Sequence, residues 1–117
     1  MTTLALVQPK APRPPKHLTK EASAFWTHVV STYALEPHHL HLLQAACESW
    51  DRMQAAREAV ATQGLTFTDN RGCIKANPAV AIEKDARIAF ARLIRELDLD
   101  EAMANLDVRP PALRSNR

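Results

Sequence analysis

Apolar residues recur at steps of three and four along three stretches of this chain, and this period predicts three amphipathic helices. The longest stretch covers residues 36–64. Pro37 suits the first turn of a helix, where its missing N–H costs nothing, and Gly64 suits the left-handed position just past the end. At a rise of ~1.5 Å per residue, this helix would be roughly 39 Å long. One side of it carries the apolar residues Leu40, Leu43, Ala46, Cys47, Trp50, Met53 and Val60.

A shorter helix is predicted before the long one. Thr19 is a suitable N-cap, and Glu21 would lie in the positively polarised first turn. Its apolar stripe consists of Ala22, Phe25, Trp26, Val29, Val30 and Tyr33. Only residues 34–36 separate the two helices, so we expect an antiparallel pair that packs through Trp26 and Trp50.

A third long helix is predicted from Asn77, as N-cap, and Pro78 to about Leu97. Its core stripe consists of Ile82, Ala86, Ala89, Phe90, Leu93 and Leu97. Residues 65–77 before it have strand-forming side chains on both sides of the turn 69–72, which predicts a small β-hairpin. The expected fold is therefore mainly α, an antiparallel helical hairpin plus a third long helix, with one β-hairpin between helices two and three. A short acidic helix or turn is expected over residues 98–107.

The two ends of the chain differ in composition from the middle. We expect a flexible Pro-rich arm over residues 1–17, one helical domain over 18–107 and a loose tail over 108–117. The 117 residues carry a net charge of +2, divided as +4 over residues 1–20, −5 over 21–107 and +3 over 108–117. Basic ends on an acidic body suggest a polyanionic partner, although short solvated tails would have the same composition.

Two groups of basic residues are candidates for contact with a phosphate backbone. The first is the acid-free arm, with Lys10, Arg13 and Lys16. The second lies on the hairpin and one sector of the third helix and consists of Arg71, Lys75, Lys84, Arg87, Arg92 and Arg95. The alternative for the helix is that Glu83–Arg87 and Arg92–Glu96 pair at i,i+4 spacing and neutralise this face.

Apolar residues that lie off the core stripe are candidates for contacts between subunits. Val80, Ile88 and Ile94 border or interrupt the basic sector of the third helix, and Arg57 lies within the apolar stripe of the long helix. We expect these four residues at an oligomer interface. Isolated exposure of the apolar residues, with a solvated end of the long helix, is the alternative.

The sequence contains no catalytic motif, neither a Gly-rich phosphate loop nor a paired Cys motif. His38 and His41 have helical ligand spacing, but no third ligand completes a metal site, so we expect no metal and no cofactor. No apolar run approaches the ~20 residues of a membrane span. Two cysteines without a signal peptide fit a reduced cytosolic setting. The residues therefore support a non-enzymatic helical module.

The order of these features resembles the phage terminase small subunits of tailed phages and prophages. Four stretches carry the resemblance: PRPPKHLTKEASAFW, LEPHHLHLLQAACESWDRMQAAREAV, GLTFTDNRGCIKANPAV and AIEKDARIAFARLIRELDLD. The segment Gly64-Leu65-Thr66, the junction Asn77-Pro78-Ala79 and the pair Ala86-Arg87 are the most specific parts. The chain is on the short side for the family, and its tail after the last helix is brief.

This resemblance implies a non-catalytic part in packaging double-stranded viral DNA in the cytoplasm of an infected or lysogenic bacterium. The implied protein is a homo-oligomer, often a ring, which recognises the genome, and recruits and modulates the large subunit that holds the ATPase and nuclease. Two other functions are compatible with the residues, namely a protein-interaction adaptor and a small helical transcription regulator. Against the regulator, the long helix exceeds a recognition helix and the turn before it lacks the usual Gly.

Overall fold

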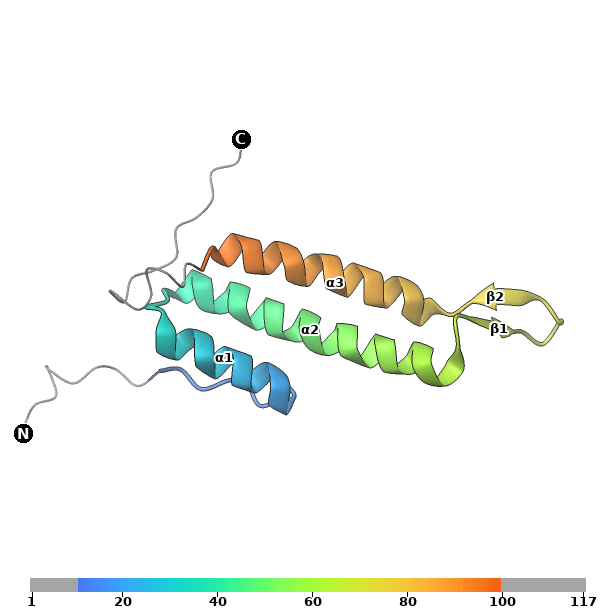
Figure 1. Cartoon of the computed structure of the whole chain (residues 1–117), viewed down its shortest axis with the longest axis horizontal. Helices are drawn as coiled ribbons and strands as arrows, with labels where there is room; N and C mark the ends of the chain where they lie inside the picture. Colours follow the sequence, from blue (N-terminus) through green and yellow to red (C-terminus); the bar gives the residue numbers. More distant parts are fainter. Residues whose placement is uncertain (1–10, 100–117) are drawn as a thin grey trace, which may run out of the picture.

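The computed structural model describes residues 11–99 of the chain. The elements follow one another as α1 (Lys20–Thr32), α2 (Pro37–Gln63), β1 (Thr66–Thr68), β2 (Ile74–Ala76) and α3 (Pro78–Leu97). Figure 1 shows α2 between α1 and α3, with the β-hairpin projecting from the far end of the α2–α3 pair. The mainly α fold with one small hairpin between the second and third helices is thus confirmed. The expected helix or turn over 98–107 lies almost wholly outside the described residues.

The ends of the helices follow the local chemistry of the sequence. The Thr19 hydroxyl accepts the Ala22 N–H at 3.3 Å and caps α1. Gly64 ends α2 with a φ of 88°, a conformation that a residue without Cβ adopts at little cost. The Asn77 side chain accepts the Ala79 N–H at 3.0 Å and caps α3. These three predicted boundaries are confirmed, because capping depends on only a few neighbouring residues.

The main core lies where all three helices overlap. Its buried cluster is made of Leu18, Ala22, Trp26, Val29, Tyr33, Leu43, Cys47 and Leu97. Beyond this cluster, α3 is the only one of the described helices that lies beside α2 (Figure 1). The buried residues of this part are small or flexible, among them Ala56, Ala79 and Met53. The hydrophobic core is therefore concentrated at the end of the molecule that is opposite to the hairpin.

The two tryptophans differ in their burial and in their partners. Trp26 is buried, and its indole N–H donates to the carbonyl oxygen of Pro12 at 2.9 Å. Trp50 is only half-buried, and its ring packs against Phe90 of α3 with a centroid separation of 5.3 Å. Trp50 thus packs against the core cluster, but it is only half-buried there, and its ring also meets α3, a partner that the sequence period could not identify.

Residues 11–17 of the Pro-rich segment lie against the helices. The Pro12 carbonyl is held by Trp26, Leu18 is buried, and the His17 ring contacts the Glu48 carboxylate at 2.7 Å. The backbone N–H of Thr19 donates to the Asp51 carboxylate at 2.9 Å. The packed part of the chain therefore begins before residue 18. Lys10 and the tail 108–117 lie outside the described residues.

His39 departs from the polar, exposed helix start that its neighbours suggest. It is 2% exposed, and its ring Nδ1 accepts the backbone N–H of Glu36 at 3.1 Å. Burial is the main cause that lowers its pKa below the ordinary 6.5, the nearby His38 ring lowers it further, and Glu36 acts in the opposite direction. His39 therefore acts as a neutral residue that closes the first turn of α2.

Candidate nucleic-acid interface

The outward face of α3 presents three cations that no acid neutralises within the described residues. Lys84, Arg92 and Arg95 are exposed, and none of them forms an ion pair with another residue of 11–99. At 100° per residue these side chains lie within a sector of roughly 80°, opposite to the buried Ala86 and Leu97. Of the two i,i+4 pairs in the alternative for this helix, Arg92–Glu96 is not formed. A rigid helix thus holds several positive charges on one side, as a phosphate-binding face requires.

Arg87 and Arg57 have a different position from the one expected. Both contact the carboxylate of Glu83, Arg87 at 3.6 Å along α3 and Arg57 at 3.7 Å from α2. The Glu83 side chain is 16% exposed, so this three-residue network lies at the seam between the two helices. The Glu83–Arg87 pair of the alternative is therefore present, and it partly neutralises Arg87. Arg57 links α2 to α3 within the subunit.

The hairpin turn is organised by Asp69. Its carboxylate accepts the backbone N–H groups of Arg71 and Cys73, both at 2.9 Å, and contacts the Lys75 ammonium at 3.2 Å. The two backbone hydrogen bonds and then Lys75 lower the pKa of Asp69. Gly72, with a φ of 81°, allows the chain to reverse. The turn leaves the Arg71 side chain exposed at the tip, whereas Lys75 has an acidic partner.

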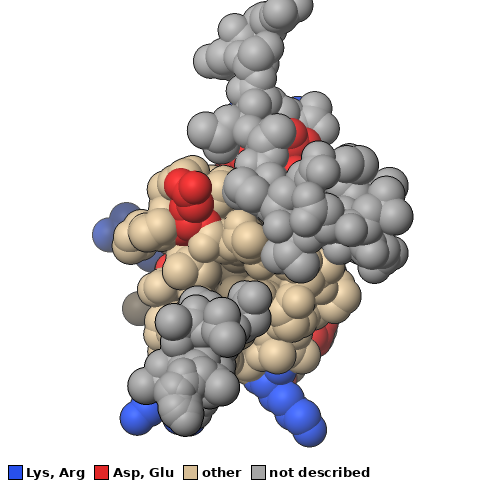
Figure 2. Space-filling view, turned by 90° about the vertical axis from the view of Figure 1, so that its left-hand side faces the viewer, with Lys and Arg blue, Asp and Glu red and all other residues tan. Residues whose placement is uncertain are grey.

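The two basic groups lie on different sides of the molecule. Arg13 and Lys16, both exposed, belong to the segment that packs beside α1, whereas the cations of α3 lie on the far side of α2 (Figure 1). In the end-on view of Figure 2, Lys and Arg side chains project from the lower edge, on the side of α1. A single subunit does not join the two groups into one continuous basic surface.

The apolar candidates for subunit contacts differ in their exposure. Val80 and Ile88 are 39% and 40% exposed, so both are available to a partner. Ile94 is half-buried and packs against the core cluster of its own subunit. Ile82, expected in the core, is 45% exposed, at the end of the α2–α3 pair that α1 does not reach (Figure 1). The first turns of α3 therefore carry more uncovered apolar surface than the sequence period indicates.

The hairpin, which should need a helix or a neighbouring chain to pack on, adds exposed apolar residues beyond the four that the sequence reasoning assigned to subunit contacts. Leu65, Phe67 and Ile74 are 65%, 45% and 76% exposed. The antiparallel register pairs Phe67 with Lys75 and Thr68 with Ile74, so apolar side chains lie on both faces of the ribbon. A strand that alternates polar and apolar residues normally buries one face. Apolar residues on both faces of three-residue strands were the signal that could have pointed to a contact surface.

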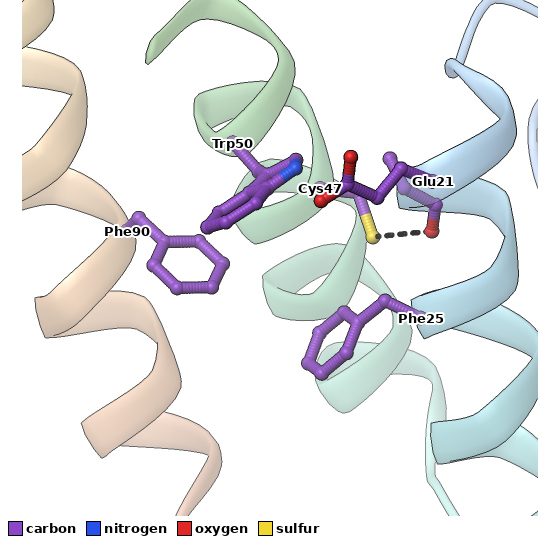
Figure 3. Close-up of a pocket in the computed structure, with 6 residues that line it drawn as sticks. Glu21, Phe25, Cys47, Trp50 and Phe90 are labelled. Atoms are coloured by element: carbon purple, nitrogen blue, oxygen red, sulfur yellow. Dashed lines mark hydrogen bonds between the residues drawn. The ribbon is translucent and has the colours of Figure 1, made fainter. Parts of the chain in front are cut away.

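An aromatic pocket lies between the three helices, which sequence reasoning also missed. Its volume is about 150 Å³, and its lining comes from Glu21, Ala22, Phe25, Cys47, Trp50 and Phe90. Figure 3 shows Trp50, Phe90 and Phe25 around this space, with the Cys47 thiol turned to the carbonyl oxygen of Ala22 at 3.6 Å. Burial, followed by the nearby Asp51 and Glu48 carboxylates, raises the pKa of Cys47 to about 11. This thiol is protonated and acts as part of an apolar wall.

Within residues 11–99, no group of three or more His, Cys, Asp or Glu side chains converges on one point. None of the described helices is long and apolar enough to cross a membrane.

The chain was compared with known proteins. A model of the family described as phage terminase, small subunit, matches residues 22–105. The match covers more than half of the chain and includes nearly all of α1 together with α2, the hairpin and α3. No curated protein and no solved structure matches the chain.

Proposed function

The chain belongs to the phage terminase small-subunit family, and from this premise we propose that it is the non-catalytic DNA-recognition component of a viral genome-packaging motor. In this proposal it acts in the cytoplasm of the infected or lysogenic host, as a homo-oligomer. It binds double-stranded viral DNA, and it recruits and modulates the large subunit, which holds the ATPase and nuclease. The observation that carries the proposal is the family match over residues 22–105.

The outward face of α3 supports the DNA-binding part of the proposal. Lys84, Arg92 and Arg95 project from one rigid helix without acidic partners among the described residues, and Arg71 extends from the hairpin at one end of the same helix. Each phosphate that such a cation neutralises releases a bound counterion, which favours association. We propose this face as the first DNA contact, with Lys75 and Arg87 weakened by Asp69 and Glu83.

The arm is proposed as a second, sequence-independent contact through Lys10, Arg13 and Lys16. Its described part is anchored at Pro12 and His17, so Arg13 and Lys16 are held close to α1. Because this anchor and α3 lie on opposite sides of α2, the two contacts meet one duplex only if different subunits supply them, or if the duplex passes around the edge of the subunit. A ring would repeat both contacts and add them through avidity.

The decisive experiment is the salt dependence of duplex binding by fluorescence anisotropy. Wild type is compared with two triple variants that remove the same charge: Lys84, Arg92 and Arg95 to Ala, and Lys10, Arg13 and Lys16 to Ala. A triple variant that loses three phosphate contacts should flatten the slope of log K against log salt by up to about 2.7. Wild type that binds no duplex at low salt would contradict the DNA-recognition proposal and would favour the adaptor.

The homo-oligomer is tested separately by the mass in solution. Val80 and Ile88 are exposed and lie outside the core stripe, and Ile88 lies one turn from both Lys84 and Arg92 on the outward face of α3. We propose a contact between subunits through Val80 and Ile88 as the alternative to a DNA contact at this part of the face. Ile88→Glu should shift the mass towards the monomer while the helical circular dichroism is retained. Exposed Ala55→Glu, on α2, is the charge-matched control. A wild-type chain that is monomeric at all concentrations would rule out the assembly.

A further inference from the structure

The hairpin carries an exposed aromatic ring on a defined face. Phe67 lies directly opposite Lys75 in the antiparallel register, while Thr68 and Ile74 occupy the other face. All three residues of each strand are exposed. A two-stranded hairpin is at best marginally stable by itself in water, so an apolar ring on such a ribbon gains stability from a partner surface. The face of Phe67 and Lys75 is therefore a candidate contact surface.

The aromatic pocket has the size and chemistry for one such ring. Its volume of about 150 Å³ is comparable to that of a cavity that accepts benzene. The half-buried rings of Trp50 and Phe90 are tilted by 54° to each other, which leaves ring faces and edges for a further aromatic group. Glu21 at the rim is exposed, and it forms no ion pair with another residue of 11–99.

A subunit does not bring its own Phe67 to its own pocket. Trp50 lies thirteen residues before the end of α2, which corresponds to roughly 20 Å along the helix, and the hairpin projects beyond that end (Figure 1). The exposed ring and the pocket are two separate surfaces of one chain.

Resting on the proposed homo-oligomer, we propose that the hairpin of each subunit docks on the next subunit, with Phe67 in the aromatic pocket and Lys75 facing Glu21. The contact is head-to-tail, because the surface that a subunit offers differs from the one that it accepts. Repeated contacts of this kind close into a ring when the rotation allows it. The charges agree with this arrangement: the hairpin carries Arg71 and Lys75 against the single acid Asp69, and the rim of the pocket carries Glu21.

The first test compares the two faces of the hairpin. Phe67→Ala should weaken self-association at least about tenfold by sedimentation or native mass spectrometry, as the loss of a central aromatic anchor does. Ile74→Ala is the matched control, because it removes a more exposed apolar side chain from the opposite face and should leave association within about twofold. Both residues are exposed, so both variants should keep the wild-type circular dichroism. Equal effects of the two variants would overturn the proposal.

The second test places cysteines at the proposed contact and keeps Phe67 in place. Glu21→Cys and Lys75→Cys, combined with Cys73→Ser, should form disulfides between subunits under mild oxidation and give a ladder of covalent oligomers. The control carries Thr68→Cys in place of Lys75→Cys, on the other face of the ribbon, and should give no ladder. Equal cross-linking of both pairs, or of neither, would overturn the docking even if the chain is oligomeric and binds DNA. A monomeric wild type would overturn the docking and the proposed assembly together.

Discussion

Asn77 joins three parts of the fold, and its replacement offers a sharp test of how the hairpin is held. The residue is 6% exposed. Its side-chain oxygen accepts the Ala79 N–H at 3.0 Å, its side-chain nitrogen donates to the carbonyl of Gly64 at 2.9 Å, and its backbone N–H donates to Leu65 at 2.8 Å. One side chain thus caps α3 and also ties the start of α3 to the end of α2.

The two side-chain bonds have separable energies. Loss of an N-cap costs about 1 kcal/mol, and loss of a hydrogen bond to a partly buried carbonyl costs about 0.5–1.5 kcal/mol. Asn77→Ala removes both, so the free energy of unfolding should fall by about 1.5–2.5 kcal/mol. Asn77→Ser keeps a capping oxygen but is too short to reach Gly64, so it should lose only about 0.5–1.5 kcal/mol. The difference between the two variants measures the cap.

The assay is urea unfolding followed by circular dichroism, together with hydrogen exchange of the hairpin amides. Both Asn77 variants should speed exchange at the backbone N–H of residue 77, which bonds to Leu65, whereas only Asn77→Ala should expose the Ala79 amide. Asn70→Ala, in the exposed turn, makes the same chemical change as the control and should stay within about 0.5 kcal/mol of wild type. If Asn77→Ala also stays within that range, the side chain does not hold the hairpin, and this account of the α2–α3 junction is wrong.

Three further predictions concern the core and the titrating groups. Leu43→Ala should cost about 2–5 kcal/mol by urea unfolding because Leu43 is 0% exposed, whereas an equal loss from exposed Ile82→Ala would contradict the observed core. Cys73 should react rapidly with Ellman's reagent at pH 8 and Cys47 only after unfolding, because Cys47 is buried with a pKa of about 11; rapid reaction of both thiols would refute this. The free energy of unfolding should fall as the pH drops below the ordinary His pKa of 6.5, because the pKa of His39 is lowered in the folded state and the unfolded chain therefore binds the proton first. His39→Gln should reduce the slope of unfolding free energy against pH, and an unchanged slope would refute the assignment to His39.

The sequence predicted the helices and their caps well because both depend on local patterns. Thr19, Gly64 and Asn77 each act within a few residues, and the three-to-four period of the apolar residues needs no knowledge of the neighbours. Which side chains meet between helices depends on the rotation and the crossing of the helices, which no local pattern contains. The partner of Trp50, the burial of His39 and the exposure of Ile82 therefore required the structure.

The candidate site shows the same division. The cations Lys84, Arg92 and Arg95 could be placed on one helix face from their spacing alone. The Arg57–Glu83 contact could not, because it joins two helices whose relative register was unknown. The pocket is invisible in sequence for the same reason, since its six lining residues come from three separate helices.

The uneven distribution of the core has a consequence for the unfolding of the subunit. The buried cluster of large side chains lies where α1 covers α2, whereas the half next to the hairpin is held largely by alanines such as Ala56, Ala79 and Ala86. Burial of a methyl group contributes far less than burial of a leucine or tryptophan, so local opening should start at the hairpin end and spread towards α1. A neighbouring molecule that binds this end in its closed form lowers the population of the opened forms by mass action. The melting temperature of the chain should then rise with its own concentration, as it does for any subunit whose least stable part is completed by another molecule.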